Sequence, residues 1–424
     1  MIKTLIIADD LSGAADCAIA CKVAGAETVV VIDAGVAPKA AAVVSVDVNS
    51  RTMSLEDAGP AAATVVERLY DKDVRILYQK VDSTLRGNWV AELIHIRQAA
   101  RKVLTHAPFV IVAPAFPDAG RTTIDGHVFV NGARLEDTEI WKREALTGPA
   151  DLRALLQRAG LKVELAKLEQ IALGAEALNA RFVRCMEDGF EAVVCDAQTE
   201  DDLLSVAEAS LALPERPLWV GSAGLMRVLA KARKADAASF SPLTLGTPGK
   251  PILVVVGSAS GVSCVQFEVL AQEPGVTALF IPPSSLRRNG DLDRTHVHIQ
   301  AIDEALRSGS DVAVMIRSEE VHLQEGSELA AALAELIAPR LSRVGGLIVT
   351  GGETARAILV KSEISGLMMQ GEVEPGVPIG LSIGKTVIPV ITKAGAFGDP
   401  TTLLRCRAAL RGSMSDHSYS TSGQ

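Results

Sequence analysis

Aromatic side chains are scarce in this chain, and several features that mark other classes of protein are missing. Only 4% of the residues are aromatic although 48% are hydrophobic, so the cores must consist of Ala, Val, Leu and Ile, as in α/β proteins. No apolar run approaches the ~20 residues that a membrane-spanning helix needs. The amino terminus also lacks the charged-then-apolar pattern of a signal peptide. We therefore expect a soluble, cytoplasmic protein with no membrane partner.

An excess of basic charge and a cysteine motif are also absent. The formal net charge is −9, which argues against a nucleic-acid partner, since such surfaces carry clustered Lys and Arg. The six cysteines form no CxxC pair and have no histidine at metal-ligand spacing, so no protein-held metal site is predicted. Cys17 and Cys21 lie four residues apart on a predicted helix, where small core residues are the usual explanation.

The length of 424 residues is too great for one ordinary core. Apolar runs at 4–8, 28–32, 42–48, 74–78 and 109–113 alternate with helical patterns, which is typical of a doubly wound parallel sheet. Residues 234–250 lose this periodicity and collect Ala, Ser, Pro and Gly. We expect an α/β protein with domains at 1–233 and 251–412, a linker at 234–250 and a disordered tail at 413–424.

The most unusual stretch of the chain is residues 80–88, Lys-Val-Asp-Ser-Thr-Leu-Arg-Gly-Asn. It follows a predicted strand and combines an ammonium, a carboxylate, two hydroxyls and a guanidinium, which suits a small, oxygenated anion. Arg86 would pair with a ligand carboxylate, and Asp82 would accept hydroxyl protons. The simpler alternative is a helix cap, with Asp82 or Ser83 capping a helix that begins at Trp89.

Two further stretches lie at predicted strand ends. Asp9 and Asp10 follow the first strand, at the carboxyl edge where ligands of α/β proteins bind, and we expect one to cap a helix and the other to act in chemistry. Residues 114–132 form a long, rigid loop around Arg121. We expect this loop to cover a site and to end in a hairpin at 126–131.

In the second half, small-residue turns follow three predicted strands, at 257–260, 351–354 and 395–398. Glycines let phosphates approach backbone N–H groups, and two of these turns open helices whose dipoles favour anions. Together they predict a nucleotide site. Lys393, beside the last turn, is either a phosphate ligand or a solvated charge.

One phosphate-binding signature is rejected. Gly384-Lys385-Thr386 resembles the end of a P-loop, but the preceding glycine stands one position too close and a strand follows instead of a helix. No GxGxxG follows a strand either, so a dinucleotide dehydrogenase has no support.

These motifs together resemble the four-carbon acid sugar kinases, a family that includes kinases of threonate, erythronate and 3-oxo-tetronate. The resemblance spans both domains in order: the Asp9-Asp10-Leu-Ser-Gly-Ala turn, residues 80–88, the Gly120-Arg-Thr-Thr segment, the Gly351-Gly-Glu-Thr turn and residues 393–398. Two departures are mild. Ser12 stands where many members have Thr, and Ala394 and Ala396 replace polar residues often seen in the last turn.

The resemblance implies two three-layer α/β/α domains with largely parallel sheets and a cleft between them, the first binding the sugar acid and the second ATP. The implied catalytic residues are Asp10 by preference, or Asp82. The expected acid-binding residues are Asp9, Asp10, Arg51, Lys80, Asp82, Ser83 and Arg86. The expected nucleotide-binding residues are Ser258, Gly351, Gly352, Glu353, Thr354, Lys393, Gly395 and Gly398.

The activity implied is transfer of the γ-phosphoryl of ATP, with Mg²⁺ as cofactor, to the 4-hydroxyl of a four-carbon acid, with D-threonate as the first choice. 3-Oxo-tetronate and erythronate remain alternatives, as does a sugar-acid sensor without catalysis. The missing dinucleotide fingerprint and histidine metal site count against an oxidoreductase or an aldolase. Monomer and homodimer both stay open.

Overall fold

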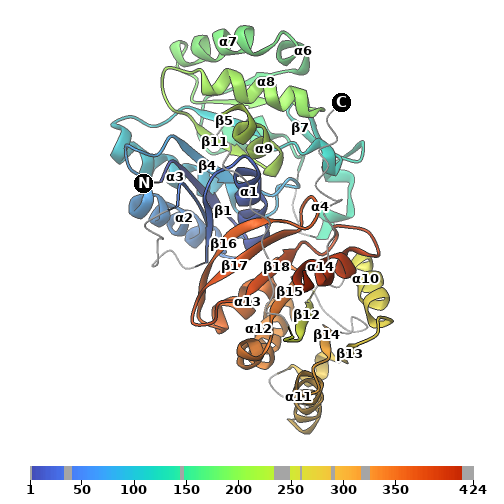
Figure 1. The fold of residues 1–424 in the computed structure, drawn as a ribbon. Helices are drawn as coiled ribbons and strands as arrows, with labels where there is room; N and C mark the ends of the chain where they lie inside the picture. Colours follow the sequence, from blue (N-terminus) through green and yellow to red (C-terminus); the bar gives the residue numbers. More distant parts are fainter. Residues whose placement is uncertain are drawn as a thin grey trace. The chain divides into compact units, whose positions relative to one another are not determined.

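The structure, a computed structural model, describes residues 2–32, 41–143, 148–233, 249–257, 260–287, 292–316 and 325–412. The chain divides into two compact units, Met1–Ser239 and Phe240–Gln424 (Figure 1). The predicted tail, and the predicted linker up to residue 248, lie outside the described residues. Within the described part, no helix is long and apolar enough to cross a membrane.

Unit 1 contains a parallel sheet with strand order β2-β3-β1-β4-β11-β5-β10-β9. Its strands are β1 (Thr4–Ala8), β2 (Thr28–Val31), β3 (Val43–Asp47), β4 (Ile76–Lys80), β5 (Val110–Ala113), β9 (Val163–Ala166), β10 (Ala192–Cys195) and β11 (Leu218–Gly221). Its helices are α1 (Leu11–Val23), α2 (Leu55–Leu69), α3 (Trp89–Leu104), α4 (Glu139–Arg143), α5 (Leu152–Arg158), α6 (Leu168–Ile171), α7 (Ala175–Glu187), α8 (Glu200–Leu211) and α9 (Ala223–Ala232).

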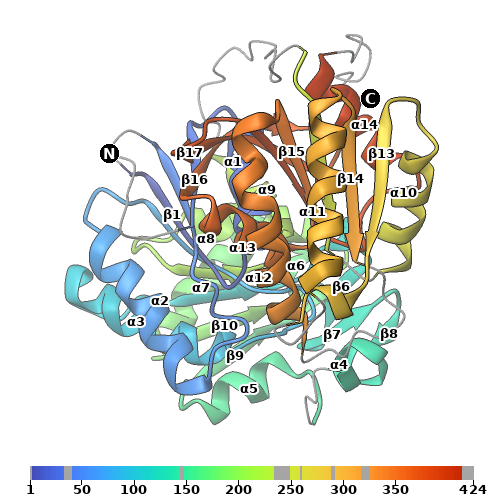
Figure 2. The ribbon, with the colours of Figure 1, turned by 90° about the horizontal axis from the view of Figure 1, so that it is seen from below.

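Helices cover both faces of this sheet, as the continuous apolar strands require. Helices α2 and α3 lie side by side on one face, and α1, α9, α8 and α7 pack in succession on the other (Figures 1 and 2). The second face holds a core that includes Tyr78, Phe182 and Trp219. Cys17 and Cys21 belong to the same core and are buried, which confirms their prediction as packing residues.

A small antiparallel sheet follows β5 and consists of β6 (Arg121–Ile124), β7 (His127–Val130) and β8 (Ala133–Arg134). The predicted hairpin at 126–131 is therefore wrong in its bounds: the tight turn is Asp125-Gly126, and both residues have positive φ. The buried carboxylate of Asp196 accepts hydrogen bonds from the backbone N–H groups of these two residues at 2.7 and 2.9 Å. This contact fixes the hairpin to the end of β10.

Unit 2 has strand order β13-β14-β12-β15-β18-β17-β16. Its strands are β12 (Ile252–Val256), β13 (Val276–Ile281), β14 (Asp311–Ile316), β15 (Gly346–Thr350), β16 (Ile364–Glu372), β17 (Pro378–Gly384) and β18 (Pro389–Lys393). Its helices are α10 (Gly261–Ala271), α11 (Leu292–Arg307), α12 (Gly326–Ile337), α13 (Gly352–Lys361) and α14 (Thr402–Arg411).

The sheet of unit 2 is parallel from β13 to β18 and antiparallel at β17 and β16. Strand β16 was not predicted, because its small and polar residues break the apolar run that marked the other strands. Helices α12 and α13 pack against each other (Figure 2), and α10 packs against α14 over a separate core. The Gly384-Lys-Thr segment connects β17 to β18, so no helix follows it.

Candidate active site

The strand order of unit 1 brings the predicted acid-binding residues together. Strand β1 lies between β3 and β4, and Ala8 at its end is level with Asp47 on one side and Lys80 on the other. The chain continues from these three strand ends into Asp9-Asp10, Asn49–Arg51 and residues 81–88. Residues more than 70 positions apart therefore share one edge of the sheet, where parallel α/β folds place their ligands.

Arg51 holds Asp9 and Asp10 together. Its Nε and Nη2 donate to the two carboxylate oxygens of Asp9 at 2.7 and 3.0 Å, and its Nη1 donates to Asp10 Oδ2 at 2.8 Å. Burial raises the pKa of Asp9, and the neighbouring guanidinium opposes this shift. All three nitrogens of Arg51 are thus engaged by protein carboxylates.

Asp10 also caps the first helix of the chain. Its Oδ1 accepts the backbone N–H of Gly13 at 2.8 Å, and its backbone is extended, as expected for the N-cap of α1. The side chain of Asp10 is 21% exposed, against 3% for Asp9. Asp10 is therefore the one of the pair that a ligand can reach.

Lys80 lies behind these carboxylates, with only 6% of the residue exposed. Burial lowers its pKa, but the charges of Asp9 and Asp10 outweigh burial, so the net pKa is raised and the ammonium stays charged. The first turn of α1 runs directly over it: a Cβ on Gly13 would come 2.6 Å from Lys80 Nζ. The glycine of the Asp9-Asp10-Leu-Ser-Gly motif thus makes room for this ammonium.

Asp82 and Arg86 form a bidentate pair within the 80–88 stretch. Arg86 Nε and Nη2 donate to the two oxygens of Asp82, each at 2.8 Å, and Asp82 also accepts the N–H and hydroxyl of Thr84. Burial opposes the shift, yet these bonds hold the pKa of Asp82 far below its usual range. Ser83 lies in the same turn.

The helix-cap alternative for this stretch is wrong. Helix α3 begins after Asn88, which makes no side-chain capping bond, and neither Asp82 nor Ser83 reaches it. Two residues of the stretch, Leu85 and Gly87, have positive φ. A bulky residue held in the left-handed region is strained, and here the strain places Leu85 in the core.

The sequence reasoning missed Glu92, which lies beneath the site on α3 with 1% exposure. Its Oε2 accepts Gln79 Nε2 at 3.4 Å, while Oε1 has no partner among the described residues. Burial, and then the charge of Asp9, raises the pKa of Glu92 to about 7. The only signal in the sequence is an acidic residue on the apolar face of a predicted helix.

In unit 2, the turn after β15 opens α13. Gly351 has a φ of +94° and precedes the first turn, Gly352-Glu353-Thr354. Thr354 packs against the turn after β12 so closely that a Cβ on Gly257 would come 1.9 Å from its Oγ1. Burial raises the pKa of Glu353. Ser258 lies outside the described residues, so its predicted role has no structural counterpart here.

Hydrogen bonds from the buried side chain of Lys393 stabilise the loop after β18. Lys393 Nζ donates to the carbonyls of Ala394, Gly395 and Phe397 at 2.9, 3.3 and 2.9 Å, and burial lowers its pKa to about 8. The alternative of a solvated charge is therefore wrong. The hydroxyls of Ser260 and Ser263 also donate to Gly395 O, at 2.6 and 2.8 Å. These bonds direct the carbonyls of the loop toward Lys393, Ser260 and Ser263.

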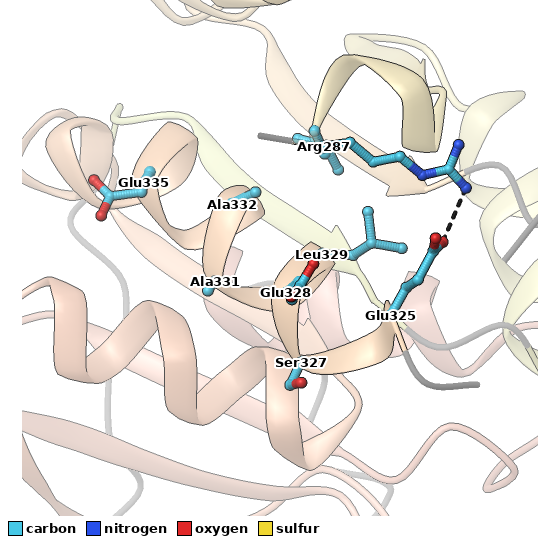
Figure 3. A pocket seen from close by; sticks show the side chains of 9 residues that line it. Arg287, Glu325, Ser327, Glu328, Leu329, Ala331, Ala332 and Glu335 are labelled. Atoms are coloured by element: carbon cyan, nitrogen blue, oxygen red, sulfur yellow. Dashed lines mark hydrogen bonds and ion pairs between the residues drawn. The ribbon is translucent and has the colours of Figure 1, made fainter. Parts of the chain in front are cut away.

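A cavity of about 430 Å³ lies along helix α12 of unit 2 (Figure 3). Arg287 and Glu325 pair across one end at 2.9 Å, and Glu328 and Glu335 contribute further acidic groups. None of the predicted nucleotide-binding residues lines it. An acidic wall repels phosphates, so this cavity does not suit a nucleotide.

Comparison with known proteins gives the same division of the chain. A family model described as a sugar-binding N-terminal domain matches residues 4–229, and one described as a nucleotide-binding C-terminal domain matches residues 253–403. A D-threonate kinase of Cupriavidus necator is 44% identical over 406 residues, covering 94% of this chain and 96% of the relative. A 3-oxo-tetronate kinase of Pseudomonas fluorescens is 28% identical, with 92% and 93% covered.

Among solved structures, a protein of Salmonella typhimurium LT2 has the same fold, with a TM-score of 0.80 at 22% identity. The match covers 96% of this chain and 99% of the other. Two matching domain models in order, together with relatives that align along nearly the whole length, identify the chain as a member of the four-carbon acid sugar kinase family.

Proposed function

We propose that this protein is an ATP-dependent kinase that phosphorylates the 4-hydroxyl of a four-carbon sugar acid, with D-threonate as the substrate. The supporting observation is the 44% identity to a D-threonate kinase along 94% of the chain. Relatives that act on the other four-carbon acids are more distant, at 28% for 3-oxo-tetronate kinase and 26% for D-erythronate kinase. These two acids are the alternative substrates.

The acid would bind in unit 1 beside Asp9, Asp10 and Lys80. Phosphoryl transfer needs mainly positioning and a group that takes the proton of the attacking hydroxyl. Asp10 suits this role better than Asp82, because its side chain is 21% exposed against 12% for Asp82, and because the pKa of Asp82 is strongly depressed. A carboxylate with so low a pKa is a weak base.

ATP would bind in unit 2, with its phosphates at the amino-terminal turn of α13 and at the loop 394–398. The N-terminus of α13 favours negative charge, and carbonyls of the loop are directed toward Lys393. Within the described residues, no group of three or more His, Cys, Asp or Glu forms a metal site. Mg²⁺ would be held mainly by the substrate phosphates, water and one or two carboxylates, and would neutralise phosphate charge.

An ADP-release assay with Mg²⁺-ATP and a panel of four-carbon acids tests the proposal. We expect D-threonate to give the highest kcat/KM, and phosphorus NMR of the product to show a phosphate ester at C4. Release of ADP with 3-oxo-tetronate or erythronate alone would transfer the assignment to that acid. Binding of an acid without any ADP release would support a sugar-acid sensor instead.

A further inference from the structure

Arg51, Arg86 and Arg121 each carry a guanidinium group at the site. Arg51 and Arg86 already pair with carboxylates of the protein. Arg51 donates from all three nitrogens to Asp9 and Asp10, and Arg86 donates from Nε and Nη2 to Asp82. A substrate carboxylate could take the Nε edge of either arginine only by displacing a protein carboxylate. We therefore looked for an arginine at this site whose Nε edge no carboxylate occupies.

Arg121, at the start of β6, has the free donor. Its Nη1 donates to the Ala119 carbonyl of its own turn, while its Nε is buried and has no partner among the described residues. Burial lowers the pKa of Arg121, and the charges that reach it are those of Asp82 and Arg86. A buried N–H without a partner is costly, and an anionic ligand would offset that cost.

The backbone holds Arg121 in place before any ligand arrives. Its N–H and C=O exchange hydrogen bonds with Phe116 at 3.0 and 2.8 Å. Thr123 pairs in the same way with Ala197, and Asp196 fixes the hairpin turn. A donor held this rigidly loses little entropy on binding.

We propose that Arg121 binds the carboxylate of the acid through the Nε edge of its guanidinium and so selects acids over neutral polyols, while Arg51 and Arg86 position Asp9, Asp10 and Asp82. This inference rests on the proposed sugar-acid substrate. It assigns to the β6–β7 hairpin the recognition of the substrate end farthest from the reacting hydroxyl.

The test is calorimetric binding of D-threonate and of its amide, without nucleotide, to the wild type, Arg121→Ala, Arg121→Lys and Arg86→Ala. We expect Arg121→Ala to weaken acid binding by ~30–100-fold and amide binding little, so that the acid-over-amide preference disappears. Arg121→Lys should recover part of that preference, because it keeps the charge but loses the planar fork. Arg134→Ala, an exposed arginine on the same small sheet, is the matched control and should bind as the wild type does.

The preference ratio does not depend on the fraction of protein that is folded, so partial unfolding cannot imitate the result. If Arg121→Ala keeps the preference and Arg86→Ala loses it, Arg86 is the carboxylate ligand and the inference is overturned. An Arg121-dependent preference in a protein that releases no ADP would leave the inference standing and remove the proposed kinase activity. Absence of acid binding by the wild type would overturn both.

Discussion

Asp10 combines two roles that a single substitution can separate. Its Oδ1 caps α1, and its Oδ2 accepts Arg51 Nη1 at 2.8 Å at the proposed site of proton transfer. Asn caps a helix about as well as Asp but cannot accept the hydroxyl proton. We expect Asp10→Asn to lower kcat by ~10²-fold or more with little change in the KM for ATP or in thermal stability, measured by steady-state kinetics and thermal unfolding.

An aspartate that caps a different helix provides the control for this substitution. Asp151 caps α5 through the backbone N–H of Ala154 at 3.0 Å, and Asp151→Asn should leave kcat unchanged. An Asp10→Asn enzyme with wild-type kcat would exclude Asp10 as the base.

The raised pKa of Glu92 predicts how the free energy of unfolding depends on pH. Burial raises its pKa from 4.5 to about 7, so the folded protein binds this proton more tightly than the unfolded chain does. The stabilisation that the proton provides is present in full below pH 4.5 and is lost as the pH rises through 7. Relative to Glu92→Gln, which stays neutral, the wild type should lose roughly 3 kcal/mol of unfolding free energy over that window.

Urea denaturation of both proteins at pH 5 and pH 8 measures this difference. Parallel pH profiles for the wild type and Glu92→Gln would show that folding does not raise the pKa of Glu92.

At the scale of elements, the proposed nucleotide site depends on the contact between the β12 turn and helix α13. Gly257 leaves no room for a side chain, since an added Cβ would lie 1.9 Å from Thr354 Oγ1 and 2.5 Å from Thr354 Cβ. Gly257→Ala must push away the first turn of α13, which we propose as a phosphate-binding element. A shift of about 1 Å at such a turn can cost up to ~10²-fold, so we expect the KM for ATP to rise by ~10–100-fold.

Gly261→Ala is a matched control, because a Cβ at that position, at the start of α10, meets nothing within 4 Å. Kinetics for both variants, with ATP and the acid varied in turn, give the measurement. An unchanged KM for ATP in Gly257→Ala would remove the start of α13 from the nucleotide site.

At the scale of the whole molecule, each ligand should protect a different unit. A ligand at 100 times its Kd stabilises the state that binds it by about 2.7 kcal/mol. Hydrogen exchange with the acid alone should therefore slow amides in residues 9–13 and 80–88 by up to ~100-fold, and ATP alone should slow those in 351–354 and 394–398. Equal protection of both sets by ATP alone would contradict the division of ligands between the units.

The local features of this protein follow from its sequence. Continuous apolar runs marked the buried parallel strands of unit 1, and helix α3 begins at Trp89, as predicted. The motif residues follow strand ends, and parallel strands end at a common edge, so their gathering in unit 1 was predictable. Strand β16 was not, because its stability comes from pairing with β17 and not from its own composition.

The pairing of charges depends on tertiary contacts that the sequence does not show. Arg51 was expected among the acid-binding residues, but strand β3 places it beside β1, where it pairs with Asp9 and Asp10. Lys393, buried by its neighbours, turns its ammonium to three loop carbonyls. The chemical groups of a side chain limit what it can bind. Its actual partner depends on which groups the fold brings within ~3 Å, and those groups come from positions far apart in the chain.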